Sequence, residues 1–309
     1  MAQVLVVGSG NVDLVLRVPR LPRPGETVLG GGLVKALGGK GANQAVAVAR
    51  LGGRVSFVGC LGDDAHGNEL LGGLRDEGVD VSRVAVVPGE PTGVAVILVD
   101  DAAENVIAVA PGANMALDGA TVERAVSTTR EARVLLAQLE VPLPVVARAV
   151  EVAAARRMLT VLNPAPAPAE PLPATLLRHV TVLTPNRTEL ATLTGTAVPT
   201  VVEAEVAARR LLEQGVGAVV VSLGGDGALL VDARGARHHR AYPVEPVDPT
   251  GAGDAFNAGL AVALLEGKEL DEAVRFANAC GALATTRVGA QPSLPRRGDV
   301  EALLAAGQT

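Results

Sequence analysis

The sequence contains very few aromatic residues, with no tryptophan, one tyrosine and three phenylalanines among 309 residues. Proteins that bind single-stranded nucleic acid stack bases on aromatic side chains, and phosphate backbones are bound through clustered lysine and arginine. A net charge of −6 does not favour such a cluster. The composition therefore argues against nucleic acid as a partner.

Cysteine and lysine are also scarce. Two cysteines, Cys60 and Cys280, cannot make a disulfide framework, and their small or apolar neighbours predict buried thiols in a reducing compartment. The only lysines are Lys35, Lys40 and Lys268. A lysine within a glycine-rich run, such as Lys40, is therefore conspicuous.

Long apolar runs are absent, since none reaches the roughly 18 residues that a membrane span needs. The N-terminus lacks the basic region of a signal sequence, so we expect a cytoplasmic protein without a membrane partner. The chain also lacks the G-x-S-x-G nucleophile motif and the Walker A loop, and its histidines lack metal-ligand spacing.

The apolar pattern predicts a parallel β-sheet covered by helices. Short continuous apolar runs alternate with longer amphipathic stretches, as in βαβ units whose strands are buried on both faces. The predicted strands are residues 4–7, 55–58, 134–138, 159–162, 180–183 and 218–222. The predicted helices are residues 42–50, 67–77, 143–155, 202–214, 253–265 and 270–286.

Two segments, approximately residues 12–35 and 92–110, depart from this rhythm. The first is rich in proline and glycine, and the second alternates like an exposed sheet. Both are predicted to be antiparallel excursions from the main sheet. They form either a small β-sheet over the mouth of the α/β domain, from which a lid would come, or a pair of surface hairpins.

Polar residues follow the predicted strands at the points where those strands end. Ligands of open α/β sheets bind beyond the carboxyl ends of the strands. Five such ends carry hydroxyl, amide or carboxylate groups, at residues 8–13, 140, 163–166, 184–189 and 222–227. We therefore expect one binding rim, although loops are polar for other reasons as well.

Two glycine-containing motifs lie near the start of the chain. Gly8-Ser-Gly-Asn-Val-Asp13 fails the dinucleotide fingerprint, because Asp13 stands where a glycine is required, but Asn11 and Asp13 suit the hydroxyl groups of a polyol. Gly38-Gly-Lys-Gly-Ala-Asn-Gln44 opens a predicted helix, whose N-terminal N–H groups favour an anion or a hydroxyl oxygen. A flexible turn is the alternative for this second motif.

The run Asp248-Pro-Thr-Gly-Ala-Gly-Asp254 is the strongest signal of chemistry. Its glycines lead directly into an apolar helix, so their backbone amides predict a nest for charge on a transferring phosphoryl group. Asp254 lies in the first turn, where it could accept a proton from a substrate hydroxyl. A helix-capping carboxylate is the alternative role.

These motifs together resemble the ribokinase family of carbohydrate and nucleoside kinases, from Gly8 to about Leu304. The resemblance rests on eight anchors in order: Gly8-Ser-Gly-Asn-Val-Asp13, Pro24-Gly-Glu-Thr27, Gly38-Gly-Lys-Gly-Ala-Asn-Gln-Ala45, Gly62-Asp-Asp64, Asn163-Pro-Ala-Pro-Ala167, Thr184-Pro-Asn-Arg-Thr-Glu189, Asp248-Pro-Thr-Gly-Ala-Gly-Asp254 and Gly289-Ala-Gln-Pro-Ser293. It implies a single domain over residues 1–309, a Rossmann-like three-layer α/β/α fold with a mostly parallel sheet and a small β-sheet lid, and a homodimer through that lid.

The resemblance also implies ATP, Mg²⁺ and a monovalent cation, usually K⁺, and assigns roles by position. The base would be Asp254, with the anion hole at Gly251, Ala252 and Gly253. The sugar would be held by Asn11, Asp13, Gly39, Lys40, Gly41, Asn43 and Glu140. Asn186 and Glu189 would orient Mg²⁺ and phosphate through water, and the nucleotide would meet Ser222, Gly224, Gly225, Gly227, Gly253 and Asn278. The cation positions are Asp248, Thr250, Ala284, Arg287, Gly289 and Ser293, although Pro249 stands where threonine or serine is more usual.

The implied reaction is ATP-dependent phosphorylation of D-ribose at its 5-hydroxyl. Deoxyribose, another pentose or a nucleoside remains an alternative substrate. A nucleoside base would need apolar or aromatic contacts, and the lid segments contain no aromatic residue. A sugar-binding regulator without catalysis is a different class of function. The resemblance favours ribose over fructose, because a glycine run with a lysine such as Lys40 is typical of ribokinases, whereas fructokinase-like members more often lack the lysine.

Overall fold

The main sheet places seven parallel strands beside an antiparallel hairpin. The computed structural model describes residues 2–102 and 104–307. The strand order is β13-β12-β11-β10-β9-β8-β1-β4-β5, parallel except for the β11–β12 and β12–β13 pairs. These strands are β1 (Gln3–Val7), β4 (Val55–Gly62), β5 (Asp80–Val87), β8 (Ala132–Ala137), β9 (Leu159–Leu162), β10 (Val182–Leu183), β11 (Ala218–Ser222), β12 (Ala228–Asp232) and β13 (Gly235–His239).

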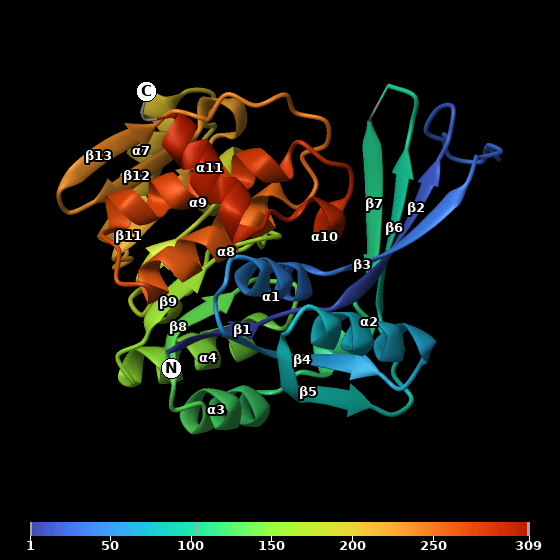
Figure 1. The fold of residues 1–309 in the computed structure, drawn as a ribbon, viewed down its shortest axis with the longest axis horizontal. Coiled ribbons are helices and arrows are strands. Elements are labelled where there is room, and N and C mark those ends of the chain that lie inside the picture. Colours follow the sequence, from blue (N-terminus) through green and yellow to red (C-terminus); the bar gives the residue numbers. More distant parts are fainter. Residues whose placement is uncertain (1, 103, 308–309) are drawn as a thin grey trace.

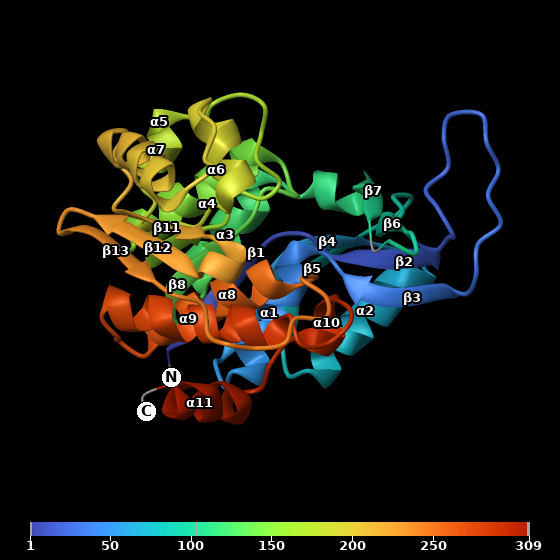
Figure 2. The ribbon, with the colours of Figure 1, turned by 90° about the horizontal axis from the view of Figure 1, so that it is seen from above.

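Helices cover both faces of this sheet, which makes the three-layer α/β/α arrangement visible in Figure 2. One layer contains α1 (Lys40–Arg50), α2 (Ala65–Asp76), α8 (Ala252–Leu265), α9 (Leu270–Ala284) and α11 (Arg297–Ala306). The other contains α3 (Gly119–Thr128), α4 (Leu143–Ala155), α5 (Ala174–Leu177), α6 (Arg187–Thr194) and α7 (Val201–Glu213). The short α10 (Ala290–Ser293) lies against β3 of a second sheet, and two 3-10 turns span Gly112–Ala116 and Gly224–Asp226. Within the described residues, no helix has the length and apolar character that crossing a bilayer requires.

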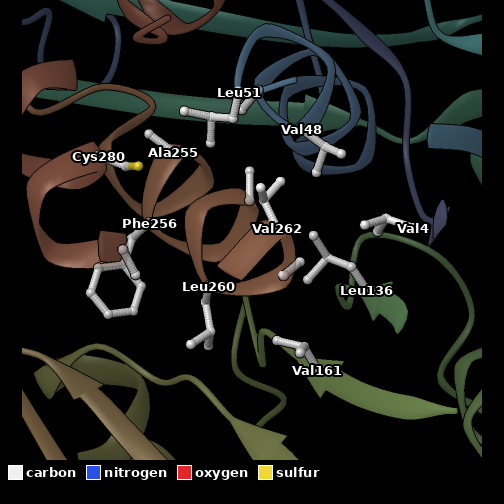
Figure 3. Close-up of a cluster of buried hydrophobic side chains, with 14 of the residues drawn as sticks. Val4, Val48, Leu51, Leu136, Val161, Ala255, Phe256, Leu260, Val262 and Cys280 are labelled. Carbon is white, nitrogen blue, oxygen red and sulfur yellow. The ribbon is translucent and has the colours of Figure 1, made fainter. Parts of the chain in front are cut away.

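Two hydrophobic cores lie on opposite faces of the sheet. Successive strand residues alternate between faces, so Val4 and Val6 enter one core while Leu5 and Val7 enter the other. Figure 3 shows the first core, in which Leu260 and Val262 of α8 lie among side chains from α1 and from the strands. Because α8 is buried around most of its circumference, it behaves as a core helix.

A second, four-stranded sheet stands to one side of the main body (Figure 1). Its order is β3-β2-β6-β7, formed by β3 (Leu33–Gly38), β2 (Asn11–Arg17), β6 (Gly93–Val99) and β7 (Asn105–Ala110). The prediction of two antiparallel excursions is wrong in one respect, because β2 pairs with β6 in parallel and joins both segments into one sheet. Figure 2 shows the long connection between β2 and β3 extending away from the body.

The predicted α/β architecture is confirmed, with local differences. The observed strands β9 and β11 and helix α4 match residues 159–162, 218–222 and 143–155. The strand predicted over 180–183 is wrong in length, because only Val182–Leu183 pairs with its neighbours. The prediction omitted strands β5, β12 and β13 and helices α3, α5, α6, α10 and α11. Cys60 and Cys280 are buried free thiols, as predicted.

Asp64 ties the second sheet to the main body. It caps α2 by accepting a hydrogen bond from Gly67 N (2.7 Å), and it accepts two more from Thr92 N (2.8 Å) and Thr92 Oγ1 (2.7 Å) immediately before β6. Burial alone would raise the pKa of Asp64, but the bonds from Thr92 and Gly67 outweigh it and lower that pKa. The ionised carboxylate therefore stabilises this junction.

Replacing Asp64 by alanine is expected to lower the free energy of unfolding by about 1–3 kcal/mol, because a helix cap and two further bonds are lost. The loss shrinks as the pH falls through the depressed native pKa, since protonation removes the same interaction. Urea unfolding of Asp64→Ala measures this, with Asp63→Ala at the neighbouring exposed position as the control. Equal unfolding midpoints for the two variants would contradict the role of Asp64.

Candidate active site

A cavity of about 210 Å³ opens at the carboxyl ends of the parallel strands. Asn163 follows β9, Thr184 follows β10 and Ser222 ends β11, and all three line the cavity. The remaining lining residues are Lys40, Ala165, Asn186, Glu189, Pro249, Gly251, Gly253, Asp254, Phe256 and Asn257. Three of the predicted strand ends therefore meet at one rim, together with the N-termini of α1 and α8.

Asp254 is buried at the base of this rim, with 8% of its surface exposed. It lies in the first turn of α8, and its two carboxylate oxygens accept hydrogen bonds from Asn43 Nδ2 and Gln44 Nε2, both at 3.0 Å. Burial raises the pKa of Asp254, while Lys40, Asn43 and Gln44 oppose that rise. A carboxylate with a raised pKa is suited to accepting a proton near neutral pH.

Lys40 lies within electrostatic reach of several carboxylates around the cavity. Burial lowers the pKa of Lys40, but Asp254, Glu140, Glu189 and Asp13 together outweigh that effect and raise it. Burial and the charges of Glu140 and Asp254 together raise the pKa of Asp13 to about 6, although Lys40 opposes the rise. One cation therefore stabilises a group of acids that repel one another.

The glycines of the first two motifs allow chain segments to approach closely. A Cβ atom at Gly38 would lie 2.2 Å from Asp13 Oδ2, and one at Gly41 would lie 2.7 Å from the backbone of Gly8 and Ser9. Gly39, with φ of 87°, immediately precedes α1. At the first residue of α1, Lys40 N donates a hydrogen bond to Glu140 Oε2 (3.0 Å). The same oxygen accepts a bond from Ser9 Oγ (2.5 Å).

Asn11 and Asn43 present their amides differently. Asn11 Oδ1 accepts a hydrogen bond from Asn114 Nδ2 (2.7 Å), which leaves its own NH₂ group to face another partner. Asn43 donates to Asp254, and its buried Oδ1 has no hydrogen-bond partner among the described residues. The two amides thus offer a donor and an acceptor, respectively, to a polyol.

Two buried side-chain amides, which hold Asn11 and Asp254 in place through hydrogen bonds, were not among the predicted site residues. Asn114 also accepts a bond from Gly10 N (2.9 Å) and so holds the β1–β2 turn. Gln44 donates to Asp254 and to Asn163 Oδ1 (3.2 Å). Gln44 lies within the recognised glycine motif, but neither role has a signal in residue spacing.

The residues predicted to form an anion hole lie at the N-terminus of α8. Gly251 precedes the helix with φ of 80°, and a side chain there would approach Ala290 to 3.1 Å. A side chain at Gly253 would meet no described heavy atom within 4 Å, so its backbone faces open space. Ala252 N, by contrast, donates to Pro249 O at 3.1 Å.

The predicted nucleotide residues divide between the cavity and its edge. Asn186 and Glu189 form a reciprocal capping box at the start of α6, each side chain accepting from the other's backbone N–H at 2.8 Å. Ser222 lines the cavity, and Gly224 and Gly225 follow in the 3-10 turn. Gly227, with φ of 90°, has a structural reason to be glycine, since a Cβ would lie 2.1 Å from His239 O.

Comparison with known proteins identifies the family of this chain. The model of the pfkB family of carbohydrate kinases matches residues 1–297. The chain belongs to this family. It is 41% identical over 292 residues to a ribokinase from Haemophilus influenzae, covering 94% of this chain and 95% of that protein. It is 34% identical over 292 residues to a deoxyribokinase from Salmonella typhi, covering 94% and 95%.

A solved structure supports the same fold assignment. The ribokinase from Arabidopsis thaliana, complexed with ribose and ATP, superposes with a TM-score of 0.91 at 36% identity, covering 98% of this chain and 99% of that one. The Rossmann-like core with a separate small sheet is therefore the ribokinase-like fold.

In this pfkB-family chain, four predicted cation positions lie together just before the N-terminus of α8 and around α10. Asp248 Oδ1 accepts from Thr250 N (2.9 Å), and Asp248 Oδ2 accepts from Gly289 N (2.8 Å). Ser293 Oγ donates to Thr250 O at 3.3 Å. Ala284 is buried just before Thr285, whose carbonyl accepts from Asp248 N (3.0 Å).

Two other predicted residues, Arg287 and Asn278, are not among the residues that line the cavity. Arg287 has an exposed side chain. Asn278 is buried in α9 and donates to Arg240 O at 2.8 Å, after β13. Across residues 2–102 and 104–307, no three or more His, Cys, Asp or Glu side chains gather closely enough to hold a metal ion by themselves.

The carboxyl of Asp13 is expected to destabilise the fold at neutral pH. Its native pKa of about 6 exceeds the unfolded value of about 3.9, so stability falls as the pH rises between these values. Asp13→Asn should therefore raise the free energy of unfolding by about 1–3 kcal/mol at pH about 8, and by less at pH about 4. Urea unfolding at both pH values tests this, with exposed Asp76→Asn as the control. An equal gain at both pH values would contradict the assignment.

Proposed function

We propose that this protein transfers the terminal phosphoryl group of ATP to the 5-hydroxyl of D-ribose, giving D-ribose 5-phosphate and ADP. The observation that carries the proposal is Asp254, a buried carboxylate in the first turn of α8, beside the open backbone of Gly253. The 41% identity to a ribokinase supports the choice of reaction and of sugar.

The sugar is proposed to bind between the second sheet and the rim. Its hydroxyl groups need both donors and acceptors, which amides, carboxylates and a lysine supply together. Asn11 offers NH₂ and Asn43 offers an unpartnered Oδ1. The full proposed set is Asn11, Asp13, Gly39, Lys40, Gly41, Asn43 and Glu140, with Asp254 at the reacting hydroxyl.

Asp254 is proposed to take the proton of the 5-hydroxyl as its oxygen forms a bond to the γ-phosphorus. The bond from that phosphorus to the bridging oxygen breaks, and ADP leaves. Backbone N–H groups at Gly251, Ala252 and Gly253 would stabilise charge on the phosphoryl oxygens. Ala252 N would exchange its bond to Pro249 O for one to the phosphoryl group.

The nucleotide is proposed to lie along Ser222, Gly224, Gly225 and Gly227, with Asn278 near the base. Asn186 and Glu189 are only two side chains, and each already accepts a hydrogen bond from a backbone N–H group. They therefore suit a Mg²⁺ ion that keeps its water ligands and binds mainly through the substrate phosphates. When bound, Mg²⁺ neutralises phosphate charge.

A monovalent cation is proposed at Asp248, Thr250, Ala284, Arg287, Gly289 and Ser293; Gly289 precedes α10 and Ser293 is its last residue. The fit rests on Asp248, whose two oxygens are held by Thr250 N and Gly289 N while its pKa is lowered by those bonds despite burial. An ionised carboxylate beside main-chain carbonyls suits K⁺. When bound, this ion would stiffen the approach to the anion hole.

The second sheet is proposed to act as a lid on a single kinase domain spanning residues 1–309, and to form a homodimer contact. Its strands expose apolar side chains, including Leu33 (64%), Val34 (59%) and Ile107 (54%). Exposed apolar sheet surface of this kind favours association. The protein is proposed to work in the cytoplasm on small molecules.

Deoxyribose is the second candidate substrate, favoured by the 34% identity to a deoxyribokinase. A panel of ribose, deoxyribose, other pentoses and nucleosides with ATP, read as ADP release, distinguishes the candidates. Ribose should give the highest kcat/KM. A higher value for deoxyribose or a nucleoside would replace the proposed substrate, and sugar binding without ADP release would indicate a non-catalytic regulator.

Asp254→Asn is expected to keep sugar binding and to lower kcat about 100- to 10,000-fold, because an amide cannot take the proton. Steady-state kinetics with calorimetric sugar titration measures both effects. Asp232→Asn is the matched control, because Asp232 is equally buried at 8% exposure but pairs with Arg237 in the hairpin. Near-normal kcat in Asp254→Asn would remove the base assignment.

Potassium is expected to raise kcat/KM above its value in sodium-only buffer, and Asp248→Asn should weaken that response because the cation loses its carboxylate. Activity titrations with KCl and NaCl at constant ionic strength measure the difference. Equal rates in both salts for the unaltered protein would count against a functional cation site.

A further inference from the structure

The side-chain amide of Gln44 is buried, with 0% of its surface exposed, and it joins the proposed base to the strands behind it. Its Nε2 donates to Asp254 Oδ1 (3.0 Å) and to Asn163 Oδ1 (3.2 Å), while its Oε1 accepts from Gln138 Nε2 (2.5 Å). These contacts reach from α1 to the ends of β8 and β9. Gln44 is absent from the lining of the cavity, so its position suits an internal support rather than a ligand for sugar.

The orientation of this amide follows from a main-chain carbonyl. Thr184 O can only accept, so Asn163 directs Nδ2 toward it (3.1 Å) and turns Oδ1 toward Gln44. Gln44 must then present its NH₂ to Asn163 and Asp254, and its carbonyl to Gln138. The chain of bonds from Thr184 O thus determines that Asp254 receives a donor.

We propose that Gln44 is a positioning residue for phosphoryl transfer: its NH₂, oriented by Asn163 and Gln138, holds Asp254 ionised and correctly oriented for the sugar hydroxyl. This inference rests on the proposed function of Asp254 as base. Asn43, the other donor to Asp254, is one of the residues proposed to bind the sugar. Gln44, by contrast, bonds to the carboxylate without lining the cavity. A hydrogen bond to a charged acceptor stabilises it by more than a neutral bond does.

The charged groups that face Asp254 come from four other elements or their ends. Lys40 of α1 favours the ionised carboxylate, and Glu140 after β8 disfavours it. Asp13 of β2 and Glu189 of α6 are also coupled to Asp254. Removing the Gln44 donor leaves Lys40 and Asn43 to oppose these acids and the effect of burial, so the carboxylate binds its proton more tightly.

Gln44→Met tests the proposal, because methionine keeps the length of the side chain and removes its donor. In saturating ribose and ATP, the acidic limb of the kcat–pH profile should move up by about one pH unit, so that kcat at a pH on this limb falls about 10-fold and the loss becomes smaller as the pH rises above it. KM for ribose should change much less than kcat. A loss of packing alone would lower kcat by the same factor at every pH.

Two further variants complete the experiment. Gln138→Met leaves Gln44 in place but frees its carbonyl, and it should move the acidic limb in the same direction by a smaller amount. The double variant should match Gln44→Met alone, because Gln138 acts through Gln44. Gln3→Met is the matched control, since Gln3 is a buried glutamine (7% exposed) at the start of β1, the opposite end from the rim.

An unchanged acidic limb in Gln44→Met, or equal shifts in Gln3→Met, would overturn the proposal. If Gln44→Met does not fold, the Gln138→Met profile decides, and an unshifted limb there overturns it equally. These outcomes differ from failure of the proposed function. In that case the unaltered protein would release no ADP with ribose, or Asp254→Asn would retain turnover.

Discussion

The burial of one carboxylate beside one lysine is the constraint on which the rest of this site depends. Asp254 is almost fully enclosed, and Lys40 and two amide donors stabilise its charge against the effect of burial. Lys40 in turn has a raised pKa because four acids surround it. Removing any one of these charges alters the proton affinity of the others, so the site behaves as a coupled group rather than as separate residues.

The fold produces this arrangement by bringing two helix N-termini to the same rim. Helix α8 is held in the core by its apolar sides, with Leu260 and Val262 among them, so its first turn cannot move independently of the sheet (Figure 3). Helix α1 packs against α8 and carries Lys40, Asn43 and Gln44 toward it. The packing of the hydrophobic layer thereby fixes the position of the Asp254 carboxylate, as a preorganised site requires.

The apolar pattern predicted the buried parallel strands well, since β9 and β11 have no polar face to obscure their limits. It failed for β13 (Gly235–His239), which has one apolar side chain and pairs only at the edge of the sheet. The glycine motifs indicated Asp254 and Lys40, and the resemblance to the ribokinase family added Asn43. Gln44 and Asn114 were missed because their partners are remote in sequence, 210 residues away for Asp254 and 103 for Asn11, and side-chain amides carry no periodic signal.

The protonation state of Asp254 at neutral pH decides whether this carboxylate can act as the base. Infrared difference spectroscopy between the unaltered protein and Asp254→Asn isolates the vibrations of this side chain. We expect the paired stretching bands of an ionised carboxylate, held in that state by Lys40, Asn43 and Gln44. A carbonyl band of a protonated acid at neutral pH would contradict it, because such a group could not accept the proton of a sugar hydroxyl.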